Sequence, residues 1–177
     1  MLKPPVESAI VIKVPEVESV VGIHRHALDP SEKWGMPAHV TLLYPFLPPS
    51  DIGAEVLTRL ETIVCRHQQF SVEFLQAAWF GDEVLWLSPE PDVSFRRLMA
   101  DLFAGFPQTP PYGGSITDPI PHLTVADGVS VHLMKEVESI VIAKLPIKAM
   151  FDSVSVMVGS PELGSWKTIA EIPLGSS

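Results

Sequence analysis

The sequence predicts an α+β fold in which two similar lobes share one cleft. A chain of 177 residues suits one domain of ordinary size, so both lobes are expected within a single domain, residues 1–177. Short strand-like segments alternate with segments of helical periodicity along the chain. Their order repeats roughly, because each half contains a short strand with a histidine, then a helix and then a pair of strands.

The first half begins with a strand, a helix and a second strand. Residues 8–14 form an apolar run that is typical of a buried strand. Residues 16–28 predict a helix that ends before Pro30, because the residue preceding a proline avoids helical dihedral angles. Residues 38–43 are apolar again and are followed by Pro45, a pattern typical of a short strand.

A second helix and a hairpin complete this half. Ser50 is a suitable N-cap, and apolar residues then recur at helical spacing as far as His67. Residues 70–74 alternate between apolar and polar side chains, whereas residues 84–87 are continuously apolar. The Gly-Asp pair at 81–82 predicts the turn that joins these two strands.

The second half repeats this order. Asp92 is expected to cap a helix that ends at Gly105. Residues 106–119 form a long loop, and residues 120–126 predict a strand. The remaining elements are a helix capped by Ser130 that runs to about residue 144, and two strands at residues 147–158 and 166–172.

Composition favours a folded protein that does not span a membrane. Apolar residues make up 46% and charged residues 19%, which is enough apolar surface to offset chain entropy. No apolar run approaches the roughly 18 to 20 residues that cross a bilayer, and the first residues lack a signal-peptide pattern. Cys65 is the single cysteine, which excludes an internal disulfide and a cysteine-rich zinc site. We therefore expect a cytoplasmic protein without a membrane partner, and we expect it to be a monomer.

The charge of the chain limits its partners. The formal net charge is −9, and a field of that sign repels a long phosphate backbone. Long nucleic acid is therefore excluded as a general partner. A small anion held by local hydrogen bonds at one site is still compatible with this charge.

A short motif occurs twice and carries the chemical prediction. Two of the six histidines are followed by a threonine two residues later, and the other four are not. The two copies are His39-Val40-Thr41-Leu42 and His122-Leu123-Thr124-Val125. On a strand, residues i and i+2 point to the same side, so each copy places an imidazole and a hydroxyl on one face.

Two such strands facing each other would suit phosphoester cleavage. The two imidazoles could flank one phosphorus atom, while the hydroxyls of Thr41 and Thr124 donate to its non-bridging oxygens. One neutral histidine would take a proton and the other, as imidazolium, would give one, because a pKa of about 6.5 allows both forms near neutrality. We therefore expect His39 and His122 as an acid/base pair that needs no metal and no cofactor.

The two motifs and their strand-like settings resemble those of the two-histidine (2H) phosphoesterase superfamily, which includes 2′,5′ RNA ligase-like proteins and cyclic phosphodiesterases. Residues 37–46, and Tyr112-Gly113-Gly114 ahead of the second motif, resemble one bacterial branch of it. The resemblance implies two pseudo-symmetric lobes of mostly antiparallel strands, with outer helices around a central cleft. It also implies metal-independent action on 2′,3′-cyclic phosphates or 2′-linked phosphoesters of small nucleotides or RNA ends.

One position departs from the pattern of that superfamily. Several RNA ligase-like members have an arginine shortly after the second motif, where it assists an anionic substrate. Here Val125 and Ala126 are followed by Asp127. A carboxylate at this position would repel phosphate if it faced the cleft.

Several residues near the motifs allow two interpretations. Aromatic side chains could stack on a nucleobase or pack in the core, namely Trp34, Tyr44, Phe46 and Tyr112. Strand parity places Tyr44 on the opposite side from His39, so we do not expect Tyr44 to be a direct ligand. The Gly-Gly pair at 113–114 could donate backbone N–H groups to phosphate or form a plain turn.

A metal site is the weaker interpretation of another cluster. His24, His26 and Asp29 are metal-ligating residue types that lie close together in the sequence. Helical spacing sends residues two positions apart to different faces, which disfavours a shared metal ion.

Three functions remain open at this point. The leading hypothesis is a phosphodiesterase that hydrolyses a small cyclic or 2′-linked phosphoester. The second is a module that binds a nucleotide or phosphorylated metabolite without turnover. The third is a 2′,5′ RNA ligase that runs the same chemistry in the reverse direction.

Overall fold

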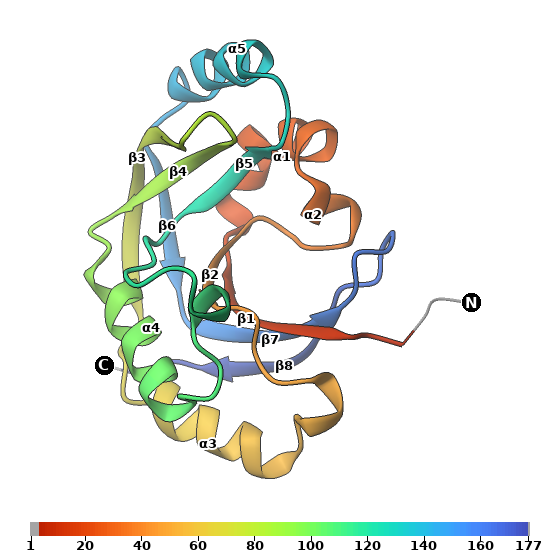
Figure 1. Cartoon of the computed structure of the whole chain (residues 1–177). Coiled ribbons are helices and arrows are strands. Elements are labelled where there is room, and N and C mark those ends of the chain that lie inside the picture. The colour runs from red at the N-terminus through yellow and green to blue at the C-terminus, as the bar shows by residue number, and fades with distance from the viewer. Residues whose placement is uncertain (1–3, 177) are drawn as a thin grey trace.

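The computed structural model describes residues 4–176, which form two four-stranded sheets (Figure 1). The sheet orders are β2-β1-β7-β8 and β5-β4-β3-β6, and every neighbouring pair is antiparallel. The strands are β1 (Glu7–Lys13), β2 (His39–Leu43), β3 (Phe70–Phe80), β4 (Val84–Glu90), β5 (Leu123–Asp127), β6 (Ile147–Phe151), β7 (Ser153–Gly159) and β8 (Lys167–Pro173).

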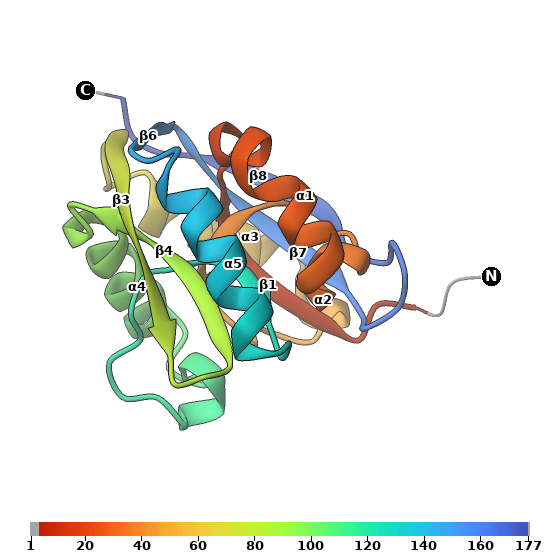
Figure 2. The same cartoon turned by 90° about the horizontal axis from the view of Figure 1, so that it is seen from above.

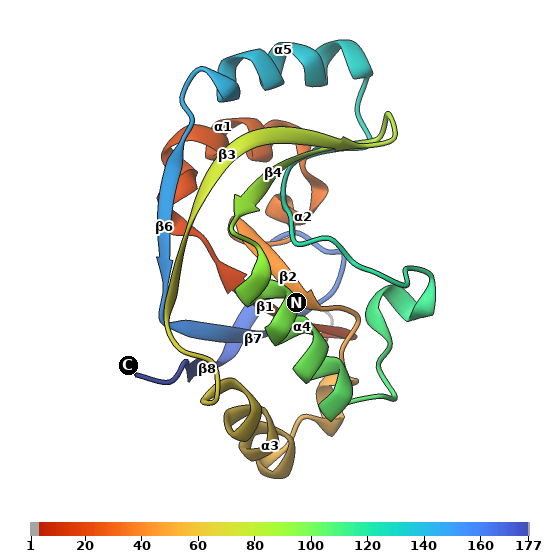
Figure 3. The same ribbon diagram turned by 90° about the vertical axis from the view of Figure 1, so that its left-hand side faces the viewer.

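The helices lie outside the two sheets. They are α1 (Glu18–Leu28), α2 (Pro30–Lys33), α3 (Ala54–Val64), α4 (Val93–Gly105) and α5 (Val131–Ile142), with 3₁₀ turns at Pro15–Val17, Pro49–Asp51 and Pro111–Gly114. Helices α1 and α5 contact the sheet that contains β5, whereas α3 and α4 contact the sheet that contains β2 (Figure 3). Seen from above, α1 and α5 lie side by side (Figure 2). Within residues 4–176, each helix is too short or insufficiently apolar to cross a membrane.

The two lobes are related in the way the repeated element order predicts. The strand that carries a histidine motif is the edge strand of its sheet in both cases, β2 in one and β5 in the other. These two edge strands contact each other, so the motifs meet where the sheets meet. The predicted α+β fold with two pseudo-symmetric lobes is therefore confirmed.

A hydrophobic core shared by both sheets holds the lobes together. One cluster of buried side chains includes Val156 of the first sheet and Phe74 of the second, both with no exposed surface. The rings of Phe70, Phe95 and Phe151 pack edge to face with centroids 5.1 to 5.4 Å apart. Such aromatic pairs add about 0.5–1.5 kcal/mol each beyond the burial of their area, and they hold α4 against β3 and β6.

The prediction of one strand over residues 147–158 was wrong. The segment is two strands, β6 and β7, which meet at Asp152 and belong to different sheets (Figure 3). The carbonyl of Asp152 accepts a hydrogen bond from the N–H of Leu174, outside either ladder. Asp152 and Ser153 are the polar residues at the point where the chain turns from one sheet into the other.

Two predicted helix starts also differ from the structure. Ser50 is not an N-cap, because it lies in a 3₁₀ turn and its hydroxyl donates to Asp51. Asp92 occupies the N-cap position of α4, but its carboxylate accepts from Arg96 instead of from backbone N–H groups. Ser130 caps α5 as predicted, because its hydroxyl accepts from the N–H of Leu133.

Candidate active site

A cavity of about 240 Å³ lies between the two motif strands. It is lined by all four residues that the sequence predicts, His39, Thr41, His122 and Thr124. All four side chains are partly exposed, whereas the residues between and after them are buried. Those buried neighbours, with at most 1% exposure, are Val40, Leu42, Leu123 and Val125. The alternation predicted for each motif is therefore present on both sides of the cavity.

The two histidines are held in the same way. The Nδ1 atom of His39 lies 2.8 Å from the carbonyl oxygen of Pro37, and that of His122 lies 2.6 Å from the carbonyl oxygen of Ile120. A carbonyl oxygen can only accept, so Nδ1 carries the hydrogen in both rings. Each neutral imidazole therefore has Nε2 as its free nitrogen, which is the atom available for proton transfer.

The second strand of the motif starts later than predicted. The prediction was one strand over residues 120–126. Strand β5 begins at Leu123, so His122 lies just before the strand and not within it. Prolines at 119 and 121 keep these residues out of the ladder, because a proline has no N–H to donate. The hydrogen bond to Ile120 orients His122 in place of the strand.

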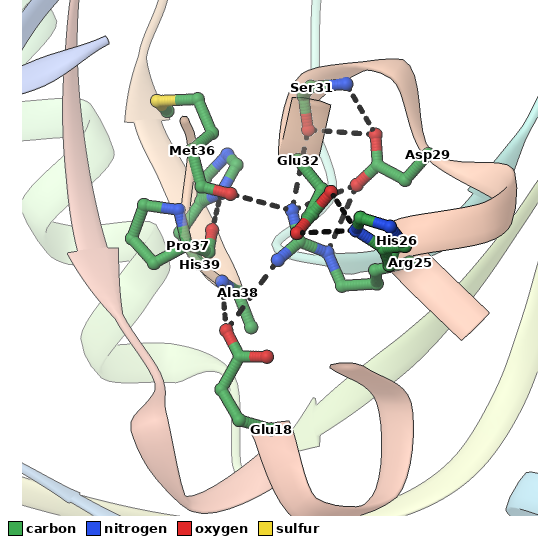
Figure 4. Close-up of polar contacts among 10 residues, drawn as sticks. All are labelled: Glu18, Arg25, His26, Asp29, Ser31, Glu32, Met36, Pro37, Ala38 and His39. Atoms are coloured by element: carbon green, nitrogen blue, oxygen red, sulfur yellow. Dashed lines mark hydrogen bonds and ion pairs between the residues drawn. The ribbon is translucent and has the colours of Figure 1, made fainter. Parts of the chain in front are cut away.

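The segment leading to His39 is fixed by a buried arginine (Figure 4). Arg25 of α1 is 1% exposed and lies 2.9 Å from a carboxylate oxygen of Asp29. Its guanidinium also donates to the carbonyl oxygen of Met36 at 3.1 Å. A carboxylate oxygen of Glu18 accepts from the N–H of Ala38 at 2.7 Å. Helix α1 thus holds both ends of the segment that places the first histidine.

The sequence analysis missed Arg25 as a residue that supports the site. The feature of the sequence that indicates this ion pair is the spacing of Arg25 and Asp29, because oppositely charged residues four positions apart on a helix are neighbours. Asp29 ends α1 and its other oxygen accepts from the N–H of Ser31, so it also caps α2. What the spacing does not reveal is that the pair is buried, with Asp29 only 2% exposed.

The surroundings of His39 keep its imidazole neutral. Burial lowers the pKa of His39 to about 4, and the hydrogen bond to Pro37 opposes that change. The charge of Arg25 lowers this pKa further, Asp29 raises it, and the proximity of His122 lowers it. At neutral pH, His39 can therefore accept a proton at Nε2.

His122 lies against an aromatic surface. Its ring meets Phe80 edge to face with centroids 4.9 Å apart, and Trp86 at 5.9 Å. Phe80 and Trp86 are themselves stacked at 4.7 Å, and Trp86 is paired with Thr124 across β4 and β5. Burial lowers the pKa of His122 too, and the hydrogen bond to Ile120 opposes that change.

The prediction that Tyr44 faces away from His39 was wrong. Strand β2 ends at Leu43, so strand parity no longer applies, and Tyr44 lines the same cavity as His39. Its hydroxyl donates to Glu7 at 3.1 Å, and its carbonyl oxygen accepts from the N–H of Tyr112 at 2.7 Å. That Tyr44 is not a direct ligand of the substrate stays a prediction.

The other aromatic candidates divide between the cavity and the core. Trp34 and Tyr112 line the cavity, whereas Phe46 is buried and packs edge to face on Phe106 at 5.0 Å. The Gly-Gly pair belongs to a plain turn, since the N–H of Gly113 donates to the carbonyl oxygen of Pro110.

Asp127 faces the cleft. It lines the cavity and also a neighbouring cavity of about 390 Å³ that continues past His122. Burial raises the pKa of the Asp127 carboxyl, and the nearby carboxylates of Asp29 and Glu83 raise it further. The second cavity is mainly apolar, with Phe80 and Ile120 among its lining residues.

The histidines and acid of α1 do not form a metal site. His26 is exposed and its Nδ1 atom lies 3.1 Å from Glu32, while Asp29 is paired with Arg25. In the part of the chain that the structure describes, no three histidine, cysteine or acidic side chains are grouped to hold a metal ion.

Comparisons with known proteins agree with this arrangement. Residues 10–161 match the family model of the 2′-5′ RNA ligase superfamily. No curated protein sequence matches the chain.

Solved structures share the fold at low identity. Escherichia coli LigT complexed with 3′-AMP is 19% identical, with 97% of this chain and 99% of LigT covered and a TM-score of 0.62. The LigT complex with NADP⁺ is 19% identical over 98% and 99% of the two chains, with a TM-score of 0.59. The Thermus thermophilus protein TT0787 is 15% identical over 97% and 99%, with a TM-score of 0.69.

The family match covers most of the chain and includes both histidine motifs, which lie on matching edge strands around one cavity. The chain therefore belongs to the 2′-5′ RNA ligase superfamily, the two-histidine phosphoesterases.

Proposed function

We propose that this protein hydrolyses a cyclic phosphodiester, namely the 2′,3′-cyclic phosphate of a small nucleotide or of an RNA end. The observation that carries the proposal is the convergence of two imidazoles on one cavity, each with Nε2 free. Each imidazole is accompanied by a threonine hydroxyl on the same wall of the cavity. This arrangement suits a reaction in which one proton is taken and one is given at a single phosphorus atom.

The reaction needs one molecule of water and no other reagent. Neutral His39 takes a proton from water at Nε2 while the water oxygen forms a bond to phosphorus. The bond from phosphorus to the ribose oxygen breaks, and protonated His122 gives its Nε2 proton to that leaving oxygen. The hydroxyls of Thr41 and Thr124 donate to the non-bridging oxygens, where charge develops in the transition state.

The different surroundings of the histidines support this division of roles. Burial and the nearby Arg25 hold the pKa of His39 at about 4, so this ring is the better candidate for the base. Burial alone lowers the pKa of His122, and its ring borders the apolar second cavity where a leaving group can lie. His122 is therefore assigned as the acid.

The size and lining of the cavities fit a nucleotide. Aromatic side chains line the cavity on the side of His39, which provides flat surfaces for a base. The structure of LigT complexed with 3′-AMP supports a nucleotide ligand for a chain of this fold. We therefore propose that a nucleobase lies beside Trp34 and Tyr112.

The test is a substrate panel with matched variants. Wild type, His39→Ala and His122→Ala are incubated with 2′,3′-cyclic nucleotides and 2′,5′-dinucleotides, with and without EDTA, and products are followed by phosphorus NMR. Hydrolysis of a cyclic phosphate by wild type that survives EDTA, with a loss of about 10²- to 10⁴-fold in either variant, is the expected result.

Three outcomes would contradict the proposal. Binding of cyclic phosphates without any product would indicate a binding module. Joining of RNA halves with 2′,3′-cyclic and 5′-hydroxyl ends, in place of hydrolysis, would indicate a ligase. Unchanged turnover in either histidine variant would remove the two-histidine mechanism.

A further inference from the structure

The cavity between β2 and β5 is lined by carboxylates, although its proposed ligand is an anion. Glu7, Asp29 and Asp127 all line it, and no lysine or arginine within residues 4–176 does so. The neighbouring cavity adds Asp118 and, over the same part of the chain, has no lysine or arginine among its lining residues either. Among the described residues, the two histidines are therefore the side chains lining the cleft that can carry positive charge.

The arginine behind His39 does not line the cleft, although its charge lowers the pKa of His39. Arg25 is buried behind the cavity, where it pairs with Asp29 and donates to Met36. Asp29 is thereby paired with a cation, and Glu7, which stays negatively charged, accepts the hydroxyl hydrogen of Tyr44. The cation and two of the three carboxylates thus have partners inside the protein.

Asp127 is the one of these three carboxylates whose side chain has no such partner among the described residues. Among the described residues, none forms a hydrogen bond or an ion pair with its side chain. It is the last residue of β5, paired with Val84 of β4, and it lines both cavities beside His122 and Thr124. Its charge consequently acts on whatever occupies the space between the two histidines.

We propose that Asp127 makes the cleft selective for phosphodiesters with one negative charge over phosphate esters with two. This inference rests on the proposed function. A cyclic phosphodiester carries one charge, whereas a phosphate monoester has a second pKa near 6 and carries almost two charges above pH 7. Hydrolysis therefore adds about one unit of negative charge to the ligand, next to the carboxylate of Asp127.

The consequence is that Asp127 expels the product. The Coulomb energy of one extra charge at ~12 Å, in a medium of effective dielectric constant ~20, corresponds to about tenfold in affinity. The substrate meets half of the repulsion that the product meets. Terminal phosphates of nucleotide monophosphates and polyphosphates are disfavoured for the same reason.

The experiment compares two ligands that differ by one charge and are not expected to cyclise. 2′-Deoxyadenosine 3′-(methyl phosphate) is a monoanion and 2′-deoxyadenosine 3′-phosphate is a dianion at pH 8, and neither has a 2′-hydroxyl. Their dissociation constants are measured by calorimetry for wild type, Asp127→Asn and Glu61→Gln. Glu61→Gln removes the same charge from an exposed position on α3, away from the cavity.

Wild type is expected to bind the monoanion about tenfold more tightly than the dianion. Asp127→Asn should reduce that ratio to about threefold or less, mainly by tightening the dianion, whereas Glu61→Gln should leave it unchanged. Asp127→Ser provides a second neutral variant. A wild-type ratio near one, an equal gain for both ligands in Asp127→Asn, or no binding of either ligand would overturn the inference.

These binding measurements, taken with the hydrolysis of the substrate panel, separate this inference from the proposed function. Binding needs no turnover, so a charge preference that depends on Asp127 without hydrolysis of any cyclic phosphate would contradict the proposed function alone. Hydrolysis by the two histidines with no charge preference would contradict the role of Asp127 alone.

Discussion

The two motif regions have the same local design and different surroundings. In both, an imidazole donates its Nδ1 hydrogen to a carbonyl oxygen two residues earlier and presents Nε2 to the cavity. His39 is backed by the buried ion pair of Arg25 and Asp29. His122 is backed by the stacked rings of Phe80 and Trp86.

That difference teaches how a repeated motif can hold two roles. Identical hydrogen bonds fix the tautomer of both rings, so the motif itself does not distinguish acid from base. The surroundings differ, because burial and the charge of Arg25 lower the pKa of His39 to about 4, whereas burial alone lowers that of His122. This asymmetry in the second layer of contacts supports the proposed roles of His39 as base and His122 as acid.

The largest expected effect is the loss of activity in the two histidine variants, and a change of leaving group tells the two variants apart. His39→Ala and His122→Ala should each lose about 10²- to 10⁴-fold in kcat on a 2′,3′-cyclic nucleotide. p-Nitrophenolate leaves without protonation. A p-nitrophenyl ester should therefore restore much of the activity of His122→Ala and little of that of His39→Ala. Steady-state rates on both esters provide the measurement, and rescue of His39→Ala alone would reverse the assignment.

Next in size is the loss of the ion pair behind His39. Arg25→Met leaves the buried carboxylate of Asp29 without its partner and should lower the free energy of unfolding by about 3–5 kcal/mol. Urea denaturation followed by circular dichroism measures the change, and addition of Asp29→Asn should restore part of it.

Arg96 supplies the matched control on the other lobe. It pairs with Asp92 and Asp118, but its side chain is 39% exposed and that of Asp118 is 85% exposed. Arg96→Met should cost at most about 1 kcal/mol, because surface ion pairs contribute little. Equal losses in Arg25→Met and Arg96→Met would show that the buried pair has no special role.

The two threonines allow a comparison between the two walls of the cavity, and the expected effect is smaller. Thr41→Val and Thr124→Val remove one hydrogen bond each to a phosphate oxygen and should lower kcat/KM by about 10- to 100-fold, as for hydrogen bonds to charged groups. The corresponding serine variants keep the hydroxyl and should retain most of the activity. If the valine variants matched wild type, the threonines would have no part in binding phosphate.

The pH profile should show the smallest effect and sharpen the comparison further. His39 acts while neutral, so kcat/KM should be lost as the pH falls through its pKa of about 4. His122 acts while protonated, so kcat/KM should fall as the pH rises past a pKa that lies below 6.5. The maximum is expected between these limits, measured with a cyclic nucleotide at low substrate concentration. An acid limb near 6.5 would show that His39 is not shielded.

Some features of the site were predictable because they are local. The placement of His39 and Thr41 on one face depends only on strand alternation, and buried Val40 confirms it. His122 precedes β5, so its hydrogen bond to Ile120 places it on the side of Thr124 instead. The position of Tyr44 was not predictable in this way, because β2 ends one residue earlier and parity no longer applies.

Other features depend on how distant segments meet. Residues 147–158 read as one strand, yet the chain turns at Asp152 to join two sheets, and both parts are apolar because both enter the same core. Arg25 and Asp29 have the spacing of an ordinary surface pair, and only packing against the segment before β2 shows that the pair is buried.

The sequence by itself determined the kinds of element, the two motifs and the face on which each histidine lies, since backbone periodicity and side-chain chemistry act over a few residues. Only the tertiary structure decided that the two edge strands meet around one cavity and that Asp127 faces it. It also decided that one imidazole is more strongly shielded than the other. Those properties arise from contacts between residues far apart in the chain, and desolvation and Coulomb interactions depend on that three-dimensional environment.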